Sequence, residues 1–193
     1  MIIGLTGGTG TGKTTISRFF AEAGFEIIDY DKVTCEVYTK GSACLNEITD
    51  TFGTDILDSC GNLNRRALGE IVFADKTLLD TLNKIVYKYI LDYTKDTIAN
   101  SKDGRLLLDA PTLFESGLNT ECDLIIGVVA KNDLKVERVT QRDHLEAARV
   151  KDRINSQKPD EFFAENCDYM IVNNGSLSDL EAQVKEVIKK LNI

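Results

Sequence analysis

The sequence predicts an α/β fold in which a parallel sheet of five strands is covered by helices on both faces. Five short apolar runs have the length and composition of buried parallel strands, and segments with helical spacing of apolar residues alternate with them. A glycine-rich segment joins the first run to the first helix. With 193 residues, of which 42% are hydrophobic and 28% charged, the chain is expected to form a single domain, 1–193.

The first half of the chain begins with two predicted strands and then becomes helical. The first strand covers Ile2 to Thr6, and the helix after the glycine-rich segment runs from Lys13 to Ala23, where Gly24 ends it. A second strand covers Phe25 to Ile28. Apolar residues then recur at intervals of three or four, which indicates a helical subdomain over residues 32–100.

The second half of the chain completes the predicted sheet. Strands are expected over Arg105 to Asp109, Leu124 to Val129 and Tyr169 to Val172, with a helix over Asn132 to Arg142 between the last two. The sequence Ser178-x-x-Glu181 matches a capping box and predicts the start of a final helix.

The glycine-rich segment satisfies the pattern G-x-x-x-x-G-K-[ST] over residues 7–14. Small residues let successive backbone N–H groups curl around phosphate oxygens, and the helix that follows points its positive end at the same anion. Lys13 can reach the β- and γ-phosphates of ATP, and the Thr14 hydroxyl can ligate Mg²⁺. The expected nucleotide-binding residues of this segment are Gly8, Thr9, Gly10, Thr11, Gly12, Lys13, Thr14 and Thr15.

Three aspartates follow predicted strands and are candidates for the chemistry. Asp29 and Asp31 bracket Tyr30, so in an extended chain their side chains share a face, and one of them could accept a hydroxyl proton near the γ-phosphate. Aspartates also end strands and cap helices, and that alternative stays open. Asp109 could support Mg²⁺ through a water molecule or could cap a turn. A signalling GTPase is disfavoured because the guanine-reading sequence [NT]-K-x-D is missing.

Arginines one helical turn apart are candidates for stabilising phosphoryl charge. Arg138 and Arg142 share a helix face, and Arg149 and Arg153 repeat the interval. Such residues can neutralise a transferring phosphoryl group, although solvated arginines are common on surface helices. The charged segment Asp143 to Lys158 has few large apolar side chains and is expected to form a solvated, mobile flap. The one histidine, His144, is expected to be merely exposed.

The composition excludes several partners. A net charge of −8 argues against a general nucleic-acid or anionic-membrane surface. No apolar stretch approaches the length of a membrane span. The five cysteines are scattered, which predicts reduced thiols and a soluble, cytoplasmic protein. The oligomeric state is expected to be a monomer or a small homo-oligomer.

Taken together, these residues resemble the dephospho-CoA kinase family, whose members carry out the last step of coenzyme A biosynthesis, and the resemblance extends from Ile3 to Val184. The family resemblance implies a three-layer P-loop kinase fold with a helical substrate-binding insertion and a lid over residues 138–160. The blocks that carry it are Gly4 to Thr15, Asp29-Tyr30-Asp31, Gly61 to Arg65 with Leu68 and Val72-Phe73, Asp109 to Gly117, Arg138-x-x-x-Arg142-Asp143 with Arg153-Ile154-x-x-Gln157, and Asp168 to Gly175.

The resemblance also implies roles for individual residues. Asp31 would take the proton from the ribose 3′-hydroxyl of dephospho-CoA, while Lys13, Arg138 and Arg142 would stabilise the phosphoryl charge. The residues implied beside the adenine of ATP are Asn173, Asn174 and Gly175, and those implied to meet the acceptor are Asp31, Arg65, Pro111 and Glu115.

Two departures from the family pattern fall in the helical subdomain. Tyr87-Lys88 stands where a His-Pro pair is usual, and Asn64 stands where an aspartate usually precedes the arginine.

Two rival functions are a shikimate- or gluconate-kinase-like enzyme and a nucleotide-binding regulatory module without turnover. The first lacks support because the only Gly-Gly pair is Gly7-Gly8, in the phosphate loop rather than near the third strand.

Overall fold

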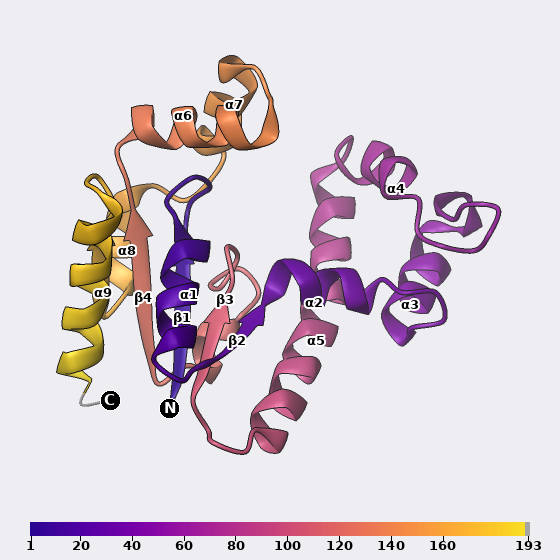
Figure 1. Cartoon of the computed structure of the whole chain (residues 1–193). Coiled ribbons are helices and arrows are strands. Elements are labelled where there is room, and N and C mark those ends of the chain that lie inside the picture. Colours follow the sequence, from indigo (N-terminus) through magenta and orange to yellow (C-terminus); the bar gives the residue numbers. More distant parts are fainter. Residues whose placement is uncertain (192–193) are drawn as a thin grey trace. The chain divides into compact units, whose positions relative to one another are not determined.

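The computed structural model describes residues 1–191 (Figure 1). The strands in that part of the chain are β1 (Ile2–Gly7), β2 (Glu26–Asp29), β3 (Leu106–Asp109), β4 (Leu124–Val129) and β5 (Tyr169–Val172). The α-helices are α1 (Lys13–Glu22), α2 (Tyr30–Val37), α3 (Ala43–Phe52), α4 (Arg65–Val72), α5 (Lys76–Asn100), α6 (Asn132–Asp143), α7 (Ala147–Asn155), α8 (Asp160–Asn166) and α9 (Leu177–Lys190). Two short 3-10 helices are η1 (Thr54–Ile56) and η2 (Leu118–Glu121).

Two compact units make up the described chain. The sheet unit consists of residues 1–28, 102–113 and 118–191, and the helical unit consists of residues 29–101 and 114–117. The sheet unit therefore carries the glycine-rich loop and the arginine-rich segment, whereas the helical unit carries Asp31 and Arg65.

The sheet has the order β2-β3-β1-β4-β5, and β1 pairs in parallel with β3 and with β4. The fold class expected from the sequence, a five-stranded parallel sheet with helices, is confirmed. Because β1 lies in the middle, the glycine-rich loop leaves the carboxyl end of a central strand. In open α/β sheets that edge is the usual place for a ligand.

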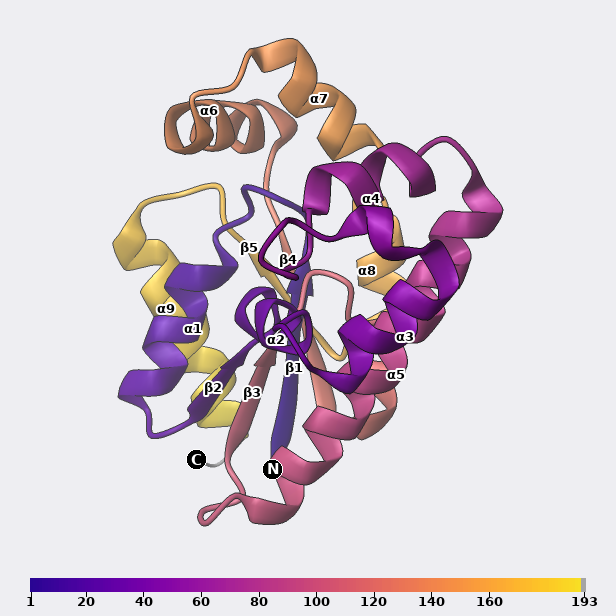
Figure 2. The same cartoon turned by 90° about the vertical axis from the view of Figure 1, so that its right-hand side faces the viewer.

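The core of the sheet unit lies between the sheet and the pair of helices α1 and α9, which run side by side on one face (Figures 1 and 2). α8 packs on β4 and β5, and Figure 2 shows it on the other side of the sheet. The fully buried members of the core between the sheet, α1 and α9 are Ile3, Leu5, Ile16, Phe20, Leu107, Ile126, Val128 and Val184. Burying these apolar side chains is what fixes α1, and with it the glycine-rich loop, against β1.

The final helix starts two residues earlier than the sequence pattern indicated. α9 begins at Leu177, and its capping box is formed by Ser176 and Asp179 rather than by Ser178 and Glu181. The prediction was wrong because two overlapping Ser-x-x-acid patterns occur in this stretch. Ser178 and Glu181 already lie inside the helix, so they cannot cap its first turn.

The helical unit is built around the 25-residue helix α5, with α2, α3 and α4 packed against it. Its apolar face buries Leu82, Ile85, Val86 and Ile90. A buried hydrogen bond of 2.6 Å between the hydroxyls of Tyr30 and Thr94 joins α2 to α5. Among residues 1–191, the structure has no helix that is both long and apolar enough to cross a membrane.

Candidate active site

The glycine-rich loop connects β1 to α1 and leaves the amino-terminal end of that helix open to a ligand. Gly12 precedes the helix with φ 97°, a left-handed conformation that favours glycine, and it provides no side chain to cap the first N–H groups. A methyl group built on Gly12 would lie 2.3 Å from Nδ2 of Asn173. Position 12 therefore has no room for a side chain, and the uncapped N–H groups of α1 are suited to an anion.

Two side chains that are distant in the sequence donate hydrogen bonds to carbonyl groups of this loop. Nδ2 of Asn173, at the end of β5, donates to the Thr11 carbonyl over 2.7 Å. Arg138 of α6 donates to the Gly10 carbonyl over 3.3 Å and to the Asn173 carbonyl over 3.1 Å. Asn173 is buried, so its amide is an internal support of the loop. The guanidinium of Arg138 consequently lies directly beside the loop.

The Lys13 ammonium group lies over the loop that it follows. Its Nζ donates to the Gly7 carbonyl over 2.7 Å, and the Thr11 hydroxyl donates to the Gly8 carbonyl over 2.8 Å. Thr14, one residue further along α1, is exposed. A positive charge, an exposed hydroxyl and the end of a helix therefore meet within one turn of chain.

Asp109, at the end of β3, is linked to the same helix through a residue that the sequence interpretation overlooked. One carboxylate oxygen of Asp109 lies 2.6 Å from the Ser17 hydroxyl. Ser17 is one turn beyond Lys13, and this four-residue spacing was the only signal that could have indicated it. Asp109 is thus held beside the first turns of α1.

The residues present fit a magnesium ion that is bound partly by the protein and partly by the phosphates of a nucleotide. Mg²⁺ usually takes only one or two protein oxygens and completes its shell with water and phosphate. The exposed Thr14 hydroxyl could supply one such oxygen, and the Asp109 carboxylate at the end of β3 is bonded to Ser17, three residues further along α1. Within residues 1–191 no group of three or more His, Cys, Asp or Glu could form an all-protein metal site.

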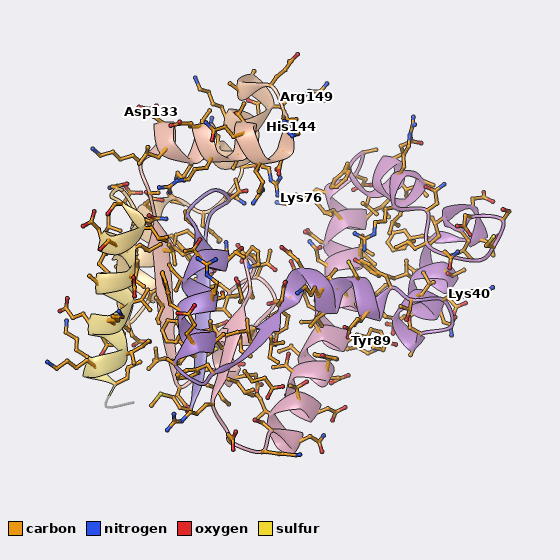
Figure 3. The ribbon with its side chains drawn as sticks, viewed as in Figure 1. Lys40, Lys76, Tyr89, Asp133, His144 and Arg149 are labelled. Atoms are coloured by element: carbon orange, nitrogen blue, oxygen red, sulfur yellow. The ribbon has the colours of Figure 1, made fainter. Side chains whose placement is uncertain are left out.

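The turn between α6 and α7 is held by an aspartate that binds two arginines. Asp143 accepts two hydrogen bonds from Arg142, and Arg153 lies 3.6 Å away from its carboxylate. The hydrogen bond from Arg142 is the main reason that the pKa of Asp143 is lowered. Arg138 and Arg142 were predicted together, but their partners differ, since Arg138 bonds the loop and Arg142 bonds Asp143. His144 lies at this turn and is exposed, as expected (Figure 3).

In the helical unit, Asp29 and Asp31 have separate environments. β2 ends at Asp29 and α2 begins at Tyr30, so the extended conformation that would place both carboxylates on one face does not occur. That expectation was wrong because Asp29 is the cap of α2, where its Oδ1 accepts from the N–H groups of Asp31 and Lys32. Asp31 lies in the first turn of α2 and is exposed.

Arg65 is brought to the face of α2 that carries Asp31. Its guanidinium donates to Sγ of Cys35 over 3.2 Å, and Cys35 is four residues after Asp31 on the same helix. The guanidinium also lies 5.6 Å from the ring centre of Tyr38. Burial raises the pKa of Tyr38 to about 12, with a further contribution from Cys44, while the charge of Arg65 opposes the rise. Arg65 of α4 thus contacts the helix, α2, that carries Asp31.

The remaining predicted residues lie at the surface or near it. Asn174 and Gly175 follow β5 and are exposed, and the Asn174 side chain accepts from the Lys131 N–H over 2.8 Å. Pro111, in the sheet unit, is partly buried, and its carbonyl lies 3.5 Å from the Thr6 hydroxyl. Glu115, in the helical unit, is exposed.

Comparison with known proteins shows which group of P-loop proteins this chain is related to. Residues 1–179 match the family model described as dephospho-CoA kinase. A dephospho-CoA kinase from Fusobacterium nucleatum is 38% identical over 96% of this chain and 95% of its own length. The chain belongs to the dephospho-CoA kinase family. The solved dephospho-CoA kinase of Campylobacter jejuni is 25% identical and superposes with a TM-score of 0.71 over 98% of this chain and 96% of its own length.

The dephospho-CoA kinase family also shares its fold with other kinases. The solved structure of a shikimate kinase from Acinetobacter baumannii superposes on this chain with a TM-score of 0.52. The superposition covers 100% of this chain and 94% of the shikimate kinase, and the two sequences are 18% identical. At that identity the likeness concerns the fold alone. The rival suggested by the sequence is therefore related in architecture, while membership of the dephospho-CoA kinase family is decided by the sequence matches.

The two departures from the dephospho-CoA kinase pattern have structural roles in this chain. Asn64 caps α4 by accepting from the Ala67 N–H over 3.1 Å, a role that asparagine and aspartate fill equally well. Lys88 and Tyr89 of α5 both donate to one carboxylate oxygen of Glu47 on α3, each over 2.6 Å (Tyr89 is labelled in Figure 3). Asn64 thus preserves the start of α4, and Lys88 contributes to a link between α3 and α5.

The cysteines of this family member should differ sharply in reactivity. Burial raises the pKa of Cys44 to about 11, of Cys122 to about 12 and of Cys167 to about 11, whereas Cys35 and Cys60 are exposed. A thiol whose pKa is raised stays protonated at pH 8, and the thiolate is the nucleophile. We expect iodoacetamide at pH 8 to alkylate Cys35 and Cys60 first, as measured by peptide mass spectrometry over time. Equal rates at Cys44 and Cys60 would contradict this assignment.

Proposed function

We propose that this protein transfers the γ-phosphoryl group of ATP to the 3′-hydroxyl of dephospho-CoA, giving coenzyme A and ADP. The observation that carries the proposal is the family match over residues 1–179, which includes both the phosphate loop and Asp31. The open, uncapped end of α1 beside Lys13 supports the ATP half of the reaction.

The proposed reaction assigns one proton transfer and one phosphoryl transfer to this chain. Asp31 accepts the proton of the 3′-hydroxyl, whose oxygen then forms a bond to the γ-phosphorus while the bond to the β–γ bridging oxygen of ATP breaks. Asp31 is suited to this role because it is exposed and because Asp29, rather than Asp31, caps α2. Arg65 of α4, which contacts Cys35 on α2, would hold the acceptor.

Positive groups of the sheet unit would stabilise the charge that develops on the phosphoryl oxygens. Lys13 and the N–H groups of the loop would bind the β- and γ-phosphates, and Arg138 would add charge beside Gly10 while it supports the loop. Arg142 would contribute from the turn that Asp143 holds. Mg²⁺, if bound, would neutralise phosphate charge, and it would be held directly by Thr14 and through water by Asp109.

The adenine of ATP would lie beside the exposed turn that follows β5. Asn174 and Gly175 face solvent there, while the buried Asn173 amide stays on the Thr11 carbonyl. Pro111 and Glu115 would contribute to the acceptor side. The proposed substrates are water-soluble, so we also propose a cytoplasmic protein without nucleic-acid or membrane partners, active as a monomer or small homo-oligomer.

An acceptor panel tests the proposed function directly. We expect ATP-dependent release of ADP with dephospho-CoA, but not with shikimate, gluconate, AMP or CMP, in a coupled assay. A dephospho-CoA analogue that lacks the 3′-hydroxyl serves as the matched control and should give no turnover. Turnover of another acceptor alone would overturn the proposal, and nucleotide binding without any turnover would favour a regulatory module.

A further inference from the structure

One N–H group of the phosphate loop already has a partner from outside the loop. The Thr9 N–H donates to Oε1 of Gln157 over 2.8 Å, and the two residues are 148 positions apart in the sequence. Thr9 is only 9% exposed, so its N–H depends on a protein or ligand partner. Gln157 lies in the short connection between α7 and α8, inside the lid segment (residues 138–160).

The contact is made directly against the loop backbone. A methyl group built on Gly8 would lie 3.1 Å from the same Oε1 atom, so the amide of Gln157 rests on Gly8 as well as on Thr9. An amide oxygen and a phosphate oxygen accept a backbone hydrogen bond in the same way, but only the phosphate is charged. Gln157 therefore occupies a donor of the kind that such loops use for phosphate.

A hydrogen bond to a charged acceptor is roughly twice as strong as one between neutral groups. A phosphate oxygen that reaches Thr9 would consequently displace the Gln157 amide. The displaced side chain has an alternative place to go, because a pocket of about 270 Å³ with mostly polar lining adjoins it. Asn155, Lys135 and Asp160 line this pocket and offer both donors and acceptors.

We propose that Gln157 is a positioning residue that competes with the phosphates of ATP for the Thr9 N–H and thereby couples loop occupancy to the lid segment. When the phosphate takes the Thr9 N–H, the connection between α7 and α8 loses its bond to the loop. When the phosphate leaves, the Gln157 amide takes the N–H again. The inference rests on the proposed function only in requiring that ATP bind to this loop.

If Gln157 competes with phosphate, removing its side chain should strengthen ATP binding. Removing a residue that binds ATP would weaken it. Gln157→Ala removes the competitor, so the dissociation constant for ATP should fall about fivefold, the factor that one neutral hydrogen bond is worth. Gln157→Glu keeps the acceptor but repels phosphate, so that variant should bind ATP more weakly than the wild-type protein. Binding is measured by titration calorimetry with ATP and with adenosine, which has no phosphate and should bind all variants equally.

The matched control is Gln141→Ala, since Gln141 is an exposed glutamine of α6 whose side chain bonds its helix neighbour Glu137. This control should bind ATP like the wild-type protein. Hydrogen exchange at the Thr9 amide gives a second readout: without nucleotide it should be faster in Gln157→Ala than in the wild-type protein, and ATP should slow it in both.

Unchanged or weaker ATP binding by Gln157→Ala, or an unchanged exchange rate at Thr9, would overturn the competition. Such a result in a protein that still phosphorylates dephospho-CoA would leave the proposed function intact. Conversely, the protein could bind ATP and show the Gln157 effect but phosphorylate no acceptor of the panel. That result would contradict the proposed function and leave the competition by Gln157 intact.

Discussion

The Asp31→Asn variant should lose kcat by ~10²-fold or more while it still binds ATP, because the proton of the acceptor hydroxyl then has no base. Asparagine preserves the size of the side chain, and Asp31 is exposed, so the fold should tolerate the change. Steady-state rates with dephospho-CoA and calorimetric ATP binding provide the two measurements.

A nearby carboxylate controls for a general effect of charge on α2. Glu36 is an exposed acid of the same helix, and Glu36→Gln should keep a nearly normal kcat. Asp29→Asn would be a poor control because Asp29 caps α2, and its effect would mix stability with chemistry. A wild-type kcat in Asp31→Asn would remove Asp31 from the role of base.

Replacing Lys13 should have an even larger effect. We expect Lys13→Ala to abolish measurable turnover, a loss of at least ~10³-fold, since the ammonium group that stabilises charge at the γ-phosphate is removed from a site that depends on electrostatics. The measurement is the rate of ADP release at saturating acceptor, with ATP varied to separate a binding defect from a chemical one.

Lys13 also bonds the Gly7 carbonyl, so a collapse of the loop must be distinguished from the loss of charge. Lys13→Met keeps most of the side-chain volume without the charge and should be as inactive as Lys13→Ala, with a thermal unfolding midpoint close to that of the wild-type protein. Lys102→Ala, at an exposed lysine of the sheet unit, is the surface control. A near-normal rate in Lys13→Met would contradict the proposed site.

Local sequence patterns correctly predicted the structural elements that are formed by residues close together in the sequence. The glycine-rich loop, its strand and the helix from Lys13 are contiguous in sequence, and their spacing expresses the geometry of one strand-loop-helix unit. The periodicity of α5 likewise reports one buried face. Family resemblance, rather than spacing, was needed to select Asp31 over Asp29.

Interactions between distant segments could not be predicted in this way. Nothing near Gln157 indicates that its amide reaches Thr9, and nothing near Asn173 indicates that it supports Thr11. The shared face expected for Asp29 and Asp31 was wrong because β2 is four residues long and turns directly into α2, so no extended stretch includes both residues. Arg138 and Arg142 share a helix face, but their partners are set by tertiary packing.

The bond between Asn173 and the loop has a consequence for the synthesis of the protein. Ribosomes make the chain from its amino terminus, so residues 7–14 emerge long before position 173. The amide that bonds the Thr11 carbonyl and fills the space beside Gly12 belongs to the residue that follows β5. A nascent chain therefore carries the complete phosphate-binding motif before the Asn173 amide that supports it has been made.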